Sequence, residues 1–156
     1  MILEAGMPAQ NVPEEINIMV IRAVFLILLG VISRDDIRYK TIPVILLILS
    51  VGLGIINIIV QGEYRPIDVV GQLFPGLFVY IIAVSKGGIA RGDACLLMAS
   101  GMILGAFYNL IFCMITFFTG GIVGLIIMIA KRDRKLELPF VPLMLVGMII
   151  EELIRA

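Results

Sequence analysis

The chain has 156 residues, of which 61% are hydrophobic and only 15% charged, and its mean hydropathy is +1.14. This composition excludes an ordinary soluble domain and predicts an all-α, polytopic membrane protein. The net charge is zero and histidine is absent, so the composition favours no nucleic-acid partner and excludes every catalytic site that needs an imidazole.

Three apolar segments follow a short N-terminal arm. Residues 1–15 are acidic, contain two prolines and lack the basic start of a signal peptide, so we expect an extracytoplasmic arm ahead of a membrane domain at 16–156. The apolar segments lie at about 16–33, 42–60 and 69–84. Each is close to the ~17 to 25 residues that cross a hydrocarbon core of ~30 Å, so each is predicted to be a spanning helix.

The next stretch, 94–130, is uncharged and too long for one crossing, because 37 residues at ~1.5 Å each reach ~55 Å. We expect it to cross twice, with the turn at Tyr108-Asn109. A last apolar segment at 139–155 brings the prediction to about six transmembrane helices.

The basic residues support six crossings with the N-terminus outside. Three cytoplasmic loops then hold nine of them: Arg34, Arg38, Lys40, Lys86, Arg91, Lys131, Arg132, Arg134 and Lys135. The outer side holds only Arg65 and Arg155, an asymmetry that predicts a multi-pass protein of the inner or plasma membrane. Arg22 lies within the first helix, and we expect it to reach the outer interface or to pair with Glu151 or Glu152.

Two acidic sites lie on the cytoplasmic side of this topology. Asp35 and Asp36 follow the first helix, and Asp93 opens the fourth after a glycine-rich loop, SKGGIARGD. Two carboxylates held close together do not ionise together easily, so one can act as a base towards water and the other as an acid towards a leaving amine. This chemistry needs no metal or cofactor, and Cys95 and Cys113 lack the spacing of a metal site.

A structural interpretation stands beside the catalytic one. Asp93 could simply be the N-cap of its helix, and Asp35 and Asp36 could form a solvated cluster neutralised by the basic residues around them. Spacing alone favours this structural interpretation.

Three stretches together resemble the type IV prepilin peptidase family, particularly its short members. DIRYKTIP at 36–43 is similar to the family's aspartate, apolar residue and arginine followed by Ile-Pro-Asn. ARGDACLL at 90–97 is similar to its GxGD signature, and LPFVPLMLVG at 138–147 looks like its proline-punctuated last helix. The resemblance spans nearly the whole chain. It implies a membrane aspartic peptidase whose catalytic pair is Asp36 and Asp93.

The resemblance also implies supporting residues and a substrate class. The glycine-rich loop at 85–93 is the expected mobile element, and Asp35 is expected to be a local charge. The supporting positions around the pair are Gly88, Arg91, Gly92, Arg38 and Pro43. The implied activity is removal of the leader peptide from prepilin-like substrates at the cytoplasmic face, with the substrate's hydrophobic helix in the bilayer, for a type IV pilus or secretion system. The cytoplasmic CxxC pairs of larger members are missing, so no methyltransferase activity is expected, and the pattern predicts no particular oligomeric state.

Three positions depart from the family's pattern. Ala90 replaces the first glycine of GxGD, Cys95 replaces a lysine, and Val44 replaces the asparagine after Ile-Pro. These departures keep open a catalytically silent scaffold or assembly protein of a pilus or secretion system. A small transporter is less favoured, because its acidic residues would lie near the midplane of helices rather than at their ends.

Overall fold

The computed structural model describes residues 12–62, 65–86, 91–131 and 139–156. These residues form six helices: α1 (Val12–Tyr39), α2 (Val44–Gln61), α3 (Pro66–Lys86), α4 (Arg91–Leu104), α5 (Ala106–Lys131) and α6 (Val141–Arg155). Four of them, α1, α2, α3 and α5, are long and apolar enough to cross a membrane. The all-α membrane fold predicted from composition is therefore confirmed. Residues 12–15 of the predicted arm belong to α1, and residues 1–11 lie outside the described part of the chain.

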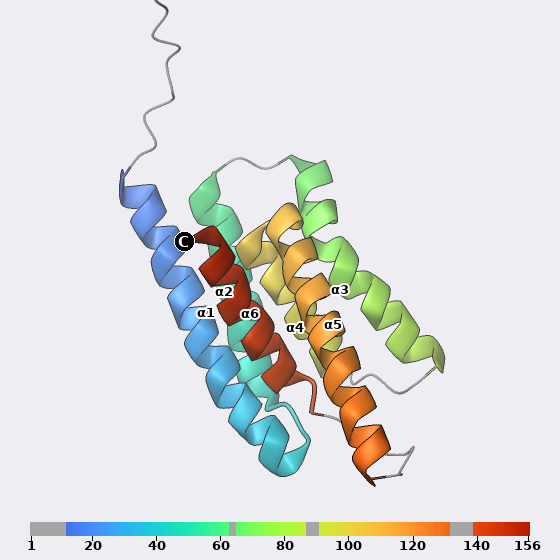
Figure 1. The fold of residues 1–156 in the computed structure, drawn as a ribbon. Coiled ribbons are helices and arrows are strands. Elements are labelled where there is room, and N and C mark those ends of the chain that lie inside the picture. Colours follow the sequence, from blue (N-terminus) through green and yellow to red (C-terminus); the bar gives the residue numbers. More distant parts are fainter. Residues whose placement is uncertain (1–11, 63–64, 87–90, 132–138) are drawn as a thin grey trace, which may run out of the picture.

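The helices pack in two layers. One layer places α6 between α1 and α5, and the other places α4 between α2 and α3. Contacts of α1 with α2 and α4, and of α5 with α3 and α4, join the layers (Figure 1). The central helices α4 and α6 are the two shortest, with 14 and 15 residues. At ~1.5 Å per residue each covers only ~21 to 23 Å, so they cross the bundle interior between longer neighbours.

Successive helices run in opposite directions (Figure 1). The C-terminal ends of α1, α3 and α5 therefore lie at the same end of the bundle as the N-terminal ends of α2, α4 and α6. This end carries Asp36 in α1 and Asp93 in α4, and we call it the aspartate end. The opposite end holds the start of α1 and the C-terminus of the chain.

The turn between α4 and α5 lies at Gly105, so the predicted turn at Tyr108-Asn109 is wrong. Gly105 has a φ of 83°, a left-handed conformation that glycine adopts without a Cβ penalty. Asn109 lies inside α5 and is fully buried, where its Oδ1 accepts the Ser100 hydroxyl at 2.9 Å and its Nδ2 donates to the Gln72 carbonyl at 3.3 Å. Its polarity serves helix packing and not a turn.

The close contact of α3 with α4 depends on a glycine. A Cβ at Gly101 would overlap the carbonyl oxygen of Gln72. Nearby, Asn57 of α2 donates its side-chain amide to the carbonyls of Met102 and Ile103, at 2.9 and 3.2 Å. These carbonyls lie in the last turn of α4, where no intrahelical donor is available, so α2 supplies the missing hydrogen bonds.

Candidate active site

Asp36 lies in the last turn of α1, and not in a loop after it, because α1 continues to Tyr39. The expectation that the helix ends at residue 33 is therefore wrong. Lys40 ends it, with a left-handed φ of 50° and an N–H that donates to the Asp36 carbonyl at 2.9 Å. Although two basic residues flank this turn, Asp36 is only 7% exposed. The carboxylate thus points into the bundle while the chain turns away at its end.

The Asp36 carboxylate caps α6. Its Oδ2 accepts the backbone N–H of Val141 at 3.1 Å, across 105 positions of sequence. Phe140 occupies the N-cap position of α6, and a phenyl ring has no oxygen with which to cap a helix. Asp36 therefore supplies from α1 the acceptor that α6 does not carry itself, and the bond orients the carboxylate.

Asp93 lies in the first turn of α4, as its third residue, and is 6% exposed. A carboxylate at this position also complements the positive end of the helix dipole. Its helix contacts α1, and both aspartates lie at the same end of the bundle (Figure 1). The two predicted catalytic side chains are thus both buried at one end, on helices that touch.

The link between α1 and α2 packs on the start of α4. Ile42 lies in this link, and its Cδ1 is 3.0 Å from the position that a Cβ on Gly92 would take. Glycine at position 92 therefore allows the segment that follows Asp36 to lie against the residue that precedes Asp93. This contact ties the two predicted motifs to each other.

The predicted supporting residues are mostly helical. Arg38 lies in α1, and Arg91 and Gly92 are the first two residues of α4, so the expectation that Arg91 and Gly92 belong to a loop is wrong. Pro43 precedes α2 with a φ of −60° and fixes its start. Arg38 and Arg91 are exposed at the aspartate end. Gly88 lies outside the described residues.

The Val141 N–H is the contact of Asp36 that sequence reasoning missed. Its contribution is a backbone N–H, which every residue except proline carries, so its identity gives no signal. The available signal is indirect: no Ser, Thr, Asp or Asn stands at 138–140 to cap the helix that follows. A helix start without its own cap needs an acceptor from elsewhere in the fold.

No group of three or more His, Cys, Asp or Glu side chains that could hold a metal occurs among the described residues.

The model of the type IV leader peptidase family matches residues 23–125, which is more than half of the chain. The chain belongs to this family. Comparisons with curated proteins and with solved structures found no match. The family segment runs from the middle of α1 into α5 and contains both aspartates. It ends before α6, so the helix that Asp36 caps lies outside the matched region.

Two of the departures from the leader peptidase pattern lie in described residues. Val44, the first residue of α2, is 68% exposed, so its side chain does not pack in the bundle. Cys95 lies one helical turn from the start of α4 and is partly buried. The third departure, Ala90, lies outside the described residues. A leader peptidase must hydrolyse a peptide bond, and buried carboxylates at the end of a membrane helix bundle are suited to that chemistry.

Proposed function

We propose that the protein is a membrane aspartic endopeptidase in which Asp36 and Asp93 form the catalytic pair. The observation that carries the proposal is the placement of both carboxylates, 7% and 6% exposed, at one end of the bundle on contacting helices. Two shielded carboxylates from distant motifs at one end of the bundle suit an acid–base pair. Membership in the leader peptidase family supplies the reaction class.

The proposed reaction is hydrolysis by activated water without a covalent intermediate. One carboxylate accepts a proton from water, and the hydroxide so formed attacks the carbonyl carbon of the scissile peptide. The other carboxyl donates its proton to the peptide nitrogen, and the C–N bond of the tetrahedral intermediate breaks to release a carboxylic acid and an amine. The N–H of Val141 would hold the Asp36 carboxylate in one orientation through this sequence.

The proposed substrate is a prepilin-like protein, cut at the cytoplasmic face. A substrate with an apolar N-terminal helix in the bilayer presents its leader junction at the membrane boundary, so that membrane insertion itself supplies orientation. The aspartate end carries exposed Arg34, Arg38, Lys40 and Arg91, which favour a cytoplasmic position. The proposed location is accordingly the inner or plasma membrane, with the N-terminus outside.

Cleavage of a candidate prepilin, co-expressed in membranes and followed by the mass of the substrate, tests this proposal. We expect Asp36→Asn and Asp93→Asn each to lower the rate of cleavage by about 10²- to 10⁴-fold, the range for losing a general acid or base. Asn keeps the size of the side chain, and at position 36 it keeps an oxygen that can accept the Val141 N–H.

Asp35→Asn is the matched control, because Asp35 is the neighbour of Asp36 and is less buried. We expect it to cut at close to the wild-type rate. Equal cleavage by all four proteins would rule out the aspartate pair. If every one of these Asn variants still supports pilus or secretion assembly, the result would favour the scaffold alternative.

A further inference from the structure

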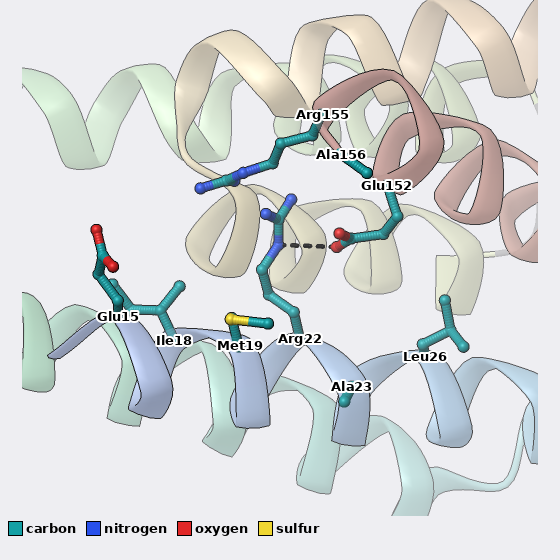
Figure 2. Close-up of a pocket in the computed structure, with 9 residues that line it drawn as sticks. All are labelled: Glu15, Ile18, Met19, Arg22, Ala23, Leu26, Glu152, Arg155 and Ala156. Atoms are coloured by element: carbon teal, nitrogen blue, oxygen red, sulfur yellow. Dashed lines mark ion pairs between the residues drawn. The ribbon is translucent and has the colours of Figure 1, made fainter. Parts of the chain in front are cut away.

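A pocket of about 600 Å³ lies at the end of the bundle opposite the aspartates. It opens between the N-terminal half of α1 and the C-terminal end of α6 (Figure 2). Arg22 of α1 and Glu152 of α6 form its inner wall, and Glu15 and Arg155 lie at its margin. None of these residues takes part in the proposed peptidase reaction, so the pocket needs its own explanation.

The inner charges of the pocket already have partners. The Nη2 of Arg22 donates to both carboxylate oxygens of Glu151, at 3.0 and 2.9 Å. Its Nε lies 3.0 Å from Oε1 of Glu152, an ion pair without an aligned hydrogen bond. Arg22 and Glu151 are almost completely buried, with 5% and 1% exposure. One guanidinium is thus shared by two carboxylates, and the Glu152 carboxylate keeps hydrogen-bonding capacity towards the pocket.

The margin adds one charge of each sign. Glu15 on α1 and Arg155 on α6 are both exposed, and in Figure 2 the Arg155 guanidinium extends across the pocket from α6. Arg155 also lies over the ring of Tyr108, with 4.7 Å from its Cζ to the ring centroid. Counted with the buried Glu151, which shares Arg22 behind the wall, the pocket region holds two guanidinium groups and three carboxylates. The pocket therefore has one carboxylate in excess and suits a ligand that brings a cation.

The remaining wall is apolar and follows the length of a membrane helix. Ile18, Ala23 and Leu26 of α1 line this side of the pocket. The eight steps of ~1.5 Å from Ile18 to Leu26 span ~12 Å along the helix axis. A polar ligand from water would gain nothing from a wall of this length, whereas a hydrocarbon chain would bury against it.

We propose that this pocket binds a phospholipid whose head group carries a primary ammonium and a phosphate. The ammonium lies against the carboxylates of Glu15 and Glu152, the phosphate against the Arg155 guanidinium, and the first part of an acyl chain along Ile18 and Leu26. An anionic lipid would leave the excess carboxylate without a partner. A quaternary ammonium would match its charge but has no N–H to donate to it.

Native mass spectrometry of the purified protein in detergent tests this proposal. The probes are phosphatidylethanolamine, phosphatidylcholine and phosphatidylglycerol with the same acyl chains, and soluble glycerophosphoethanolamine. We expect one phosphatidylethanolamine per chain to bind at least about tenfold more tightly than the other two lipids, which corresponds to ~1.4 kcal/mol. The soluble head group should bind far more weakly, because it lacks the chain that the apolar wall holds.

Glu15→Gln and Arg155→Gln should each weaken phosphatidylethanolamine binding by about tenfold. Asp68→Asn is the matched control, because Asp68 is exposed in the first turn of α3, at the same end of the bundle but outside the pocket. It should leave binding unchanged. All three changes are at exposed positions, and equal melting temperatures without added lipid would show that the variants fold alike.

Three results would overturn the proposal. They are equal binding of all three lipids, binding that neither pocket variant changes, and binding of the soluble head group as tight as that of the lipid. The last result would assign the pocket to a water-soluble ammonium phosphate ligand. Because the measurement records binding at the end away from the aspartates, its outcome does not depend on whether the protein cuts a prepilin.

Discussion

Arg22 of α1 forms a buried ion pair with α6, and pairing with Glu151 or Glu152 was one of the two alternatives predicted from the sequence, the other being that it reaches the outer interface. The structure confirms both partners. Replacing one member of such a pair leaves an uncompensated buried charge, so Arg22→Met should lower the free energy of unfolding by about 3 to 5 kcal/mol. The double variant Arg22→Met/Glu151→Leu should recover most of this loss. Thermal and denaturant unfolding in detergent micelles measures both effects.

Arg34→Met is the control for this cycle, because Arg34 is on the same helix but exposed. Its effect should stay within about 0.5 kcal/mol. A double variant no more stable than Arg22→Met would contradict the interpretation of Glu151 as a charge in need of its partner.

Asp36 has a structural role in addition to the catalytic one proposed for it, since it caps α6. Asp36→Ala removes the acceptor of the Val141 N–H and should cost about 0.5 to 2 kcal/mol of stability. Asp36→Asn should cost less, because an amide oxygen can accept the same bond. Unfolding measurements and hydrogen exchange at the Val141 amide distinguish the two variants. If the Val141 amide exchanges no faster in either variant than in the wild type, the cap is dispensable.

The helices themselves were predictable from hydropathy, but several of their ends were not. The charged run after residue 33 looked like a loop, yet α1 continues through it, because Asp36 faces the bundle while Arg34 and Arg38 face outwards. Asn109 looked like a turn residue, yet it is a buried hydrogen-bonding residue between α3, α4 and α5. In both cases tertiary contacts that no local pattern contains decided where the helix ends.

The close contact between α3 and α4 can be tested by adding a single methyl group to α4. Gly101→Ala would place a Cβ on the Gln72 carbonyl, so α3 must move, and we expect a loss of about 1 to 3 kcal/mol. Gly52→Ala in α2 is the matched control, because no atom lies within 4 Å of its added Cβ. It should be neutral or stabilise the helix by up to about 1 kcal/mol. Equal melting temperatures for the two variants would contradict close packing at Gly101.

The orientation of the whole molecule in the membrane can be tested by cysteine labelling. If the aspartate end is cytoplasmic, a cysteine at Thr41 should be protected from a membrane-impermeant maleimide in intact cells. Cysteines at Arg65 and Ala156, exposed at the opposite end, should react. Single-cysteine proteins are obtained by replacing Cys95 and Cys113 with alanine. Labelling at Thr41 alone would reverse the orientation, and labelling at Arg65 without Ala156 would show that α6 does not cross.

The candidate site was predictable only as far as the two aspartates. The two sequence motifs identify these aspartates, and the alternating directions of the helices place them at one end of the bundle. The Val141 contact was not predictable, because it joins residues 105 positions apart through a backbone group. The Arg22 pairing was predictable because unpaired charges in a membrane helix are costly and few partners lie at the same depth.

The two longest-range polar contacts described above both end on α6, the sixth described helix in chain order. The Asp36 carboxylate accepts the backbone N–H of Val141, and the Arg22 guanidinium donates to Glu151, which lies 129 positions later in the sequence. Neither contact can form before the ribosome has made α6. Until then the Arg22 guanidinium lacks its Glu151 and Glu152 partners and the Asp36 carboxylate lacks the Val141 N–H. The orientation of the Asp36 carboxylate and the neutralisation of Arg22 thus both depend on α6, and a nascent chain that stops before α6 lacks both contacts.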